Sequence, residues 1–86
     1  MPTVLRHGPY RFFFYSNEYT GADLTEPPHI HVESDSRSKT AKYWLSPVGL
    51  AKSRRFASHE LTDIQSLVQE HRTELLEEWD ARFGTQ

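Results

Sequence analysis

Hydrophobic and polar residues alternate along several short stretches in the first two thirds of the chain, a pattern typical of β-strands. Residues 3–6 are partly β-branched and end at the turn signal His7-Gly8-Pro9, after which residues 10–15 form an aromatic run. These two stretches predict a hairpin. Neither face of the aromatic strand is plainly polar, which favours a central strand or a strand that docks a partner. Residues 16–28 then form an unusually long connection.

Residues 29–33 and 39–45 are separated by a polar turn and predict a second hairpin. In the later strand Ala41, Tyr43 and Leu45 alternate with more polar neighbours. Pro47 ends this strand, and residues 48–51 predict either a short fifth strand or a turn. A basic link, residues 52–55, would then lead to the last third of the chain.

The last third of the chain has the periodicity of an amphipathic helix. Ser58 is the predicted N-cap, with Glu60 and Asp63 near the positive end of the helix dipole. One helix bent near Arg72 and Thr73, or two consecutive helices, would cover one face of the sheet. The apolar stripe comprises Leu61, Ile64, Leu67, Val68, Leu75, Leu76, Trp79 and Phe83, with His71 filling its one vacancy.

These patterns predict an α+β fold, in which an antiparallel sheet of four or five strands is built from hairpins and packed by a long C-terminal helix. The chain has 86 residues without an internal repeat or a shift in composition, so we expect one domain over residues 1–86. It has no cysteine, which excludes disulfides and thiolate chemistry. No signal peptide or membrane-spanning run is evident, so we expect a cytoplasmic protein.

Ten Lys and Arg against 12 Asp and Glu give a formal net charge of -2. The whole molecule therefore exerts no electrostatic attraction on nucleic acid, and any such contact requires a local patch.

The strand at residues 29–33 carries the most reactive pattern, because alternation places His29, His31 and Glu33 on one face and Ile30 and Val32 on the other. Two imidazoles and a carboxylate can ligate a divalent metal or transfer protons near neutral pH. The alternative is a solvated strand face on which both rings are hydrogen-bonded to neighbours or water.

Metal binding by His29, His31 and Glu33 requires a close ligand set, with His7 or His59 as other candidate ligands. Acid–base cleavage of RNA requires no metal, but two histidines must lie on opposite sides of one phosphate. His29 and His31 are neighbours along one strand, so His7 or His59 could be the second member of such a pair.

The basic residues Lys52, Arg54 and Arg55 could hold a phosphate ahead of the predicted helix, with Arg54 steadying its charge during catalysis. The alternative is a solvated link between sheet and helix. Lys42 and Trp44 share a strand face and could form a base-stacking platform beside a cation, unless Trp44 is a core residue beneath the helix.

The segments Pro27-Pro28-His29-Ile30-His31-Val32 and residues 70–79, together with the opening Met-Pro-Thr and the aromatic strand, resemble domain of unknown function 4160, a bacterial and phage family. The resemblance covers nearly the whole chain. It implies the toxin of a type II toxin–antitoxin pair, whose partner is a small antitoxin resembling domain of unknown function 2442. It carries over only His29 and His31, as the family's signature.

The favoured function is therefore a toxin that cleaves or binds RNA around His29, His31 and Arg54 and is neutralised by its small partner. One alternative is a non-catalytic interaction domain with structural histidines. Another is a metal-dependent enzyme. The aromatic strand also makes a homodimer conceivable if it is exposed.

Overall fold

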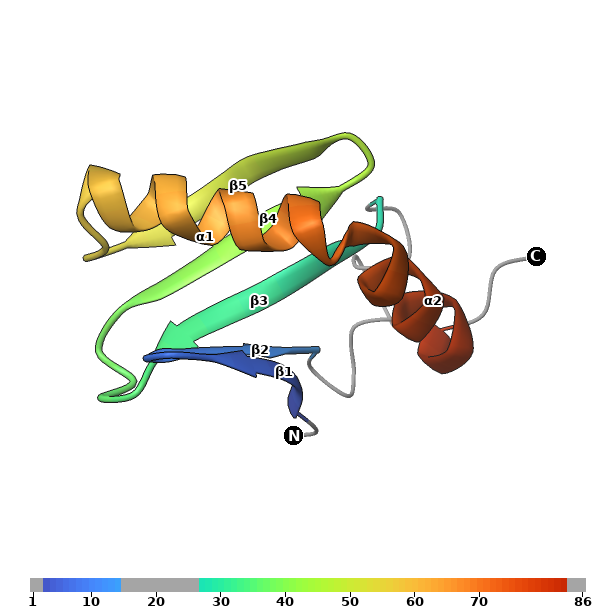
Figure 1. Ribbon diagram of the computed structural model, residues 1–86, viewed down its shortest axis with the longest axis horizontal. Coiled ribbons are helices and arrows are strands. Elements are labelled where there is room, and N and C mark those ends of the chain that lie inside the picture. The colour runs from blue at the N-terminus through green and yellow to red at the C-terminus, as the bar shows by residue number, and fades with distance from the viewer. Residues whose placement is uncertain (1–2, 15–26, 84–86) are drawn as a thin grey trace.

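The computed structural model describes residues 3–14 and 27–83 (Figure 1). These residues form one sheet of five antiparallel strands in chain order, followed by two helices. The strands are β1 (Thr3–His7), β2 (Tyr10–Phe13), β3 (His29–Ser34), β4 (Thr40–Leu45) and β5 (Val48–Arg54), and the helices are α1 (Ser58–Glu70) and α2 (Arg72–Phe83). The predicted α+β fold is confirmed.

Both predicted hairpins are present, because β1 pairs with β2 and β3 pairs with β4. The aromatic strand β2 lies between β1 and β3, as its mixed faces indicated. Its Phe12 and Phe13 are buried, as is Phe14 just after it, so they provide no exposed aromatic surface for a homodimer.

The stretch that the sequence left open is a full fifth strand, and it extends further than expected. Lys52 and Arg54 belong to β5, where they pair with Lys42 and Thr40, so the interpretation of residues 52–55 as a link is wrong. A register shift between Lys42 and Tyr43 accommodates an extra residue of β5. Such a bulge lets pairing continue beyond the point at which simple alternation fails.

The C-terminal segment forms two helices, and His71 lies at the break with φ −102° and ψ 15°. Arg72 fixes this break to the end of β4: its Nε donates to the carbonyl oxygen of Leu45 at 2.9 Å, and its Nη2 donates to Ser46 Oγ at 3.2 Å. In Figure 1, α1 lies across β4 and β5, whereas α2 continues near the start of β3. The two-helix alternative is confirmed.

Helix α1 is capped one residue earlier than predicted. Its N-cap is Ala57, and Ser58 is already helical, so the assignment of Ser58 as the cap is wrong. Alanine has no side-chain acceptor, and the Glu60 carboxylate instead accepts the Ala57 backbone N–H at 2.9 Å. This hydrogen bond, aided by Lys39 3.2 Å away, lowers the pKa of Glu60 below its usual value.

One face of the sheet and the apolar faces of the helices enclose the core. The Tyr43 hydroxyl donates to the Leu61 carbonyl oxygen at 2.7 Å, which joins β4 to α1 within this apolar layer. The buried core residues are Tyr10, Phe12, Phe14, Ile30, Val32, Ala41, Tyr43, Leu45, Phe56, Ile64, Val68, Leu75 and Trp79. The predicted helical stripe is thus confirmed through Trp79.

Two sequence predictions fall outside the part of the chain that the structure describes. They are the long connection, of which only Pro27 and Pro28 are described, and the core position of the Phe83 side chain. Within residues 58–83, neither helix has the length and apolarity needed to cross a membrane.

Candidate functional site

The face of the sheet opposite α1 carries most of the residues that the sequence singled out. Cross-strand pairing aligns His31 with Lys42 and Lys42 with Lys52, and it places Arg54 opposite Thr40 on the same face. We call this surface the far face. The pairing of β3, β4 and β5 thus brings together side chains that are up to 23 positions apart in sequence.

A hollow of about 410 Å³ opens on the far face. We call it the basic hollow, because His31, Lys42, Lys52 and Arg54 line it. Its other lining residues are Thr40, Ala41 and Ser53. Lys52 and Arg54 are exposed, whereas His31 and Lys42 are half-buried. Lys42 and Lys52 lie directly opposite each other, an arrangement of like charges that costs free energy and that a bound anion would relieve.

Trp44 lies next to the basic hollow on the same face as Lys42. The Lys42 Nζ is 5.0 Å from the centroid of the Trp44 ring, within the range of a cation–π interaction. The ring is half-buried and meets the His29 ring edge-on, with the centroids 5.9 Å apart. Trp44 is therefore not a core residue beneath α1, and the predicted pairing of an aromatic ring with a cation is present.

His29 differs sharply from His31, although both belong to β3. Its relative exposure is 0%, and its ring contacts Trp79 of α2 at 4.9 Å and the His31 ring at 5.2 Å, between centroids. Its Nδ1 lies 3.0 Å from the Pro27 carbonyl oxygen, and since a carbonyl only accepts, Nδ1 carries the proton and donates it. His29 thus packs the end of β3 against α2.

Glu33 is held by arginine rather than presented to a ligand. Arg11 Nε donates to Glu33 Oε1 at 2.9 Å, its Nη2 contacts the same oxygen, and its Nη1 donates to Thr3 Oγ1 at 2.8 Å. Across residues 3–14 and 27–83, no three His, Asp or Glu side chains cluster as metal ligands. Metal binding by His29, His31 and Glu33 would therefore require Glu33 to exchange its contact with Arg11 for the metal.

The remaining sequence candidates lie away from the hollow. His7 pairs with Tyr10 on the core side of the sheet, and His59 is an exposed residue of α1, so neither joins His31 on the far face. Arg55 follows β5 with a left-handed backbone, φ 73°, and does not line the hollow. Lys42, Lys52 and Arg54 therefore share the far face with His31, whereas His7 and His59 lie elsewhere.

Charge is divided between the two sides of the molecule. The exposed cations of the hollow lie on the sheet, whereas the helices are predominantly acidic. The acidic residues of the helices are Glu60, Asp63, Glu70, Glu74, Glu77, Glu78 and Asp80, against Arg72 and Arg82. Although the net charge of the chain is -2, the basic hollow is a local basic patch that could attract an anionic partner.

Sequence reasoning missed two features. Arg11 also points to the far face, where it lies 4.3 Å from the centroid of the Phe13 ring, and the alternation of β2 was the signal that could have identified it. The second is a groove between β5 and α1, which could not be anticipated while residues 48–51 were not assigned to a strand.

Together, the fold and the hollow define a small α+β domain: a five-stranded antiparallel meander has two helices on one side and a basic surface on the other. The chain belongs to the family described as domain of unknown function 4160, whose model matches residues 10–80. The family relationship predicted from the sequence is thus confirmed. No curated protein and no solved structure matches the chain.

Proposed function

We propose that this protein binds single-stranded RNA across the basic hollow and thereby acts as the toxin of a toxin–antitoxin pair in the cytoplasm. The observation that carries this proposal is the convergence of Lys42, Lys52 and Arg54 on one face beside His31. Clustered cations supply the electrostatic part of nucleic-acid binding, which depends on phosphate charge rather than sequence.

An extended single strand fits this surface better than a duplex. Lys52 and Arg54 are two positions apart on β5, so their Cα atoms are separated by about 6.6 Å along the strand. A single strand can place successive phosphates along such a row of cations and turn its bases toward a neighbouring aromatic ring. The half-buried Trp44 is such a ring on the far face, and Lys42 Nζ lies 5.0 Å from its centroid.

The geometry supports RNA binding more than RNA cleavage. His31 lines the basic hollow, but His29 is buried against Trp79, and His7 and His59 lie on the other side of the sheet. Acid–base cleavage with two opposed imidazoles therefore lacks a second member among the described residues. RNA cleavage and metal-dependent catalysis remain predictions from the sequence.

The toxin role rests on the family resemblance and on what RNA binding can do. A small protein that covers RNA can arrest growth without cleaving it, and a partner that masks the basic hollow would relieve the arrest. A non-catalytic protein-interaction domain is the alternative. It does not require the cations of the hollow to contact phosphate.

The test is binding of a fluorescein-labelled oligouridylate of about ten nucleotides, followed by fluorescence anisotropy at several salt concentrations. Replacement of both exposed cations, Lys52→Ala with Arg54→Ala, is expected to weaken binding roughly tenfold and to lower the salt slope by about 1.4, the value for two lost single-strand phosphate contacts. The matched control is Lys39→Ala with Arg82→Ala, which removes the same charge from residues paired with Glu60 and Glu78.

Equal losses in the two double variants would show that net charge alone governs binding and would sink the proposal. Growth after induced expression provides the cellular arm: the wild type and the control should arrest growth, and the hollow variant should not. The oligonucleotide is also examined for cleavage products with the wild type and with His31→Ala. Products that depend on His31 would establish catalysis in place of binding alone.

A further inference from the structure

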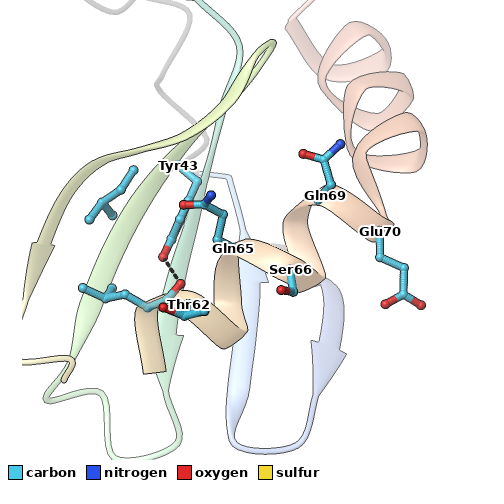
Figure 2. A pocket seen from close by; sticks show the side chains of 8 residues that line it. Tyr43, Thr62, Gln65, Ser66, Gln69 and Glu70 are labelled. Atoms are coloured by element: carbon cyan, nitrogen blue, oxygen red, sulfur yellow. Dashed lines mark hydrogen bonds between the residues drawn. The ribbon is translucent and has the colours of Figure 1, made fainter. Parts of the chain in front are cut away.

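A second surface lies along the opposite side of β5, where the strand meets α1 (Figure 2). A groove of about 490 Å³ runs between them, with Tyr43, Leu50 and Leu61 as its apolar part. Leu50 has 41% relative exposure and is the one large hydrophobic residue among the described residues that is classed as exposed. We call this surface the edge groove.

The helical wall of the edge groove is polar but largely uncharged. Thr62, Gln65, Ser66 and Gln69 follow one another at helical spacing along α1, and Figure 2 shows them in a row along the helix beside Tyr43. Glu70 lies at the far end of the row and points away from Tyr43. On an otherwise acidic helix, this row offers amide and hydroxyl groups that can both donate and accept hydrogen bonds.

β5 is also the last strand of the sheet. It pairs with β4 on one side, and no strand of the described ranges pairs with its other side. The outer backbone groups of such a strand form a template on which another extended segment can add by main-chain hydrogen bonds.

The two sides of β5 have different chemistry. Leu50 pairs with Tyr43 and faces α1, whereas Lys52 and Arg54 face the basic hollow. A segment added along this edge would send alternate side chains to the two sides, because strand side chains alternate with period two. Apolar side chains would enter the edge groove, and acidic side chains would meet Lys52 and Arg54.

We infer that the edge of β5 binds an extended segment of a partner protein in which apolar and acidic residues alternate. A second copy of this chain is a poor occupant, because pairing β5 with another β5 brings two sets of Lys52 and Arg54 together. Like charges on paired strands are destabilising. Charge complementarity therefore selects an acidic partner over self-association.

This partner would also compete with RNA, a step that rests on the proposed function. Its carboxylates would neutralise Lys52 and Arg54, which the proposal assigns to phosphate binding. The segment would in that case belong to the antitoxin, since occupation of the edge would relieve the arrest caused by RNA binding.

The test uses two labelled peptides of seven residues, the length of β5. One alternates valine and glutamate, the other valine and lysine, and binding is followed by fluorescence anisotropy up to about 1 mM, the weak end of measurable affinity. The wild type should bind the glutamate peptide and not the lysine peptide. Leu50→Asp should weaken glutamate-peptide binding at least about tenfold, because it places a charge in the apolar contact and repels the peptide.

The matched control is Ala81→Asp, which adds the same charge at an exposed position of α2. It should bind the glutamate peptide as the wild type does, and circular dichroism checks that both variants are folded. Failure of the glutamate peptide to bind, equal binding of the lysine peptide, or equal binding by Leu50→Asp would overturn the inference. So would a dimer in sedimentation experiments that Leu50→Asp dissociates.

Binding of oligouridylate by the same variants separates this inference from the proposed function. Leu50 lies outside the basic hollow, so Leu50→Asp should bind oligouridylate within about twofold of Ala81→Asp, a difference too small to indicate a lost contact. Peptide binding without RNA binding would support the edge partner and contradict the RNA proposal. RNA binding without peptide binding would support the RNA proposal and contradict the edge partner.

Discussion

The two faces of the sheet are built from the same strands but serve different purposes. On the side of α1, Phe12, Ile30 and Tyr43 are fully buried. On the far face, the next residues along those strands include His31 and Lys42, which line the basic hollow. Because strand side chains alternate, one short segment can contribute both to the stability of the fold and to a charged surface. Substitutions of the residues that line the basic hollow should therefore alter binding with little effect on folding.

Phe13 is buried although it lies on the far face, and His29 is a second exception to this division. Alternation assigns it to the same face as His31, yet it is as deeply buried as the core and packs against Trp79. It lies at the first position of β3, where α2 approaches the end of the sheet (Figure 1). The division between the faces thus holds along the middle of β3 and fails at its beginning.

The largest effect that we expect concerns this pair of histidines. His29→Ala should lower the free energy of unfolding by about 2–3 kcal/mol, because it leaves a cavity beside Trp79 and removes the hydrogen bond to Pro27. His31→Ala should lower it by less than about 1 kcal/mol, since the ring is half-buried and its removal opens onto solvent rather than leaving an enclosed cavity. Urea denaturation followed by tryptophan fluorescence measures both values.

Equal losses of stability for the two variants would contradict the structural role assigned to His29. The expected difference also limits what a double substitution of both histidines can show. If His29→Ala destabilises the fold, loss of toxicity in the double variant would not reveal whether either imidazole participates in chemistry. His31→Ala alone is the informative variant.

Local patterns predicted most of the fold. Turn residues and alternation identified both hairpins, and helical spacing identified the stripe that covers the sheet. The extent of β5 could not be predicted, because a bulge beside Tyr43 interrupts the alternation and the run of charges resembles a link. The position of the helix break also depends on a tertiary contact, from Arg72 to the Leu45 carbonyl oxygen, that no local pattern contains.

The candidate site was predicted as separate parts. Lys42, Lys52 and Arg54 were singled out for their charge, but only the pairing register brings them together with His31. The burial of His29 could not be predicted, because it depends on the packing of Trp79 from a distant helix. Likewise, the alternation that grouped Glu33 with the histidines could not reveal that Arg11 binds it.

A smaller effect concerns Tyr43 on the helix-covered face, whose ionisation should make the free energy of unfolding depend on pH. Burial raises the pKa of Tyr43 from its ordinary value of 10.0 to about 12. The neutral hydroxyl is therefore favoured in the folded state, so its contribution is fully present below pH 10.0 and is lost as the pH rises toward about 12. Tyr43→Phe should cost about 1 kcal/mol near neutral pH, through the hydrogen bond to Leu61, and should make stability fall less steeply over this alkaline range.

Urea denaturation at a series of pH values from neutral to alkaline measures this difference. Tyr10, whose pKa burial also raises, is present in both proteins and contributes a common slope. The wild type and Tyr43→Phe should therefore diverge near neutral pH and converge as Tyr43 ionises. Parallel stability curves across the alkaline range would show that ionisation of Tyr43 is not coupled to folding.

The smallest effect concerns the end of β5, where Arg55 has φ 73°. The turn after β1 uses Gly8 for a similar left-handed conformation, φ 56°, whereas Arg55 adopts it at a steric cost. Arg55→Gly removes that cost but increases the entropy of the unfolded chain, so we expect a net gain of about 0.5 kcal/mol. Arg55→Ala keeps the left-handed strain and should give no gain in urea denaturation.

The same two variants test whether the charge of Arg55 extends the basic surface, as the sequence predicted. Both lose the guanidinium, so both should weaken oligouridylate binding equally if Arg55 contacts phosphate, even though their stabilities differ. Unchanged RNA binding in both would confine the site to the hollow. A gain in stability together with a loss of binding would show that the strained backbone persists at this position because of the charge that its side chain carries.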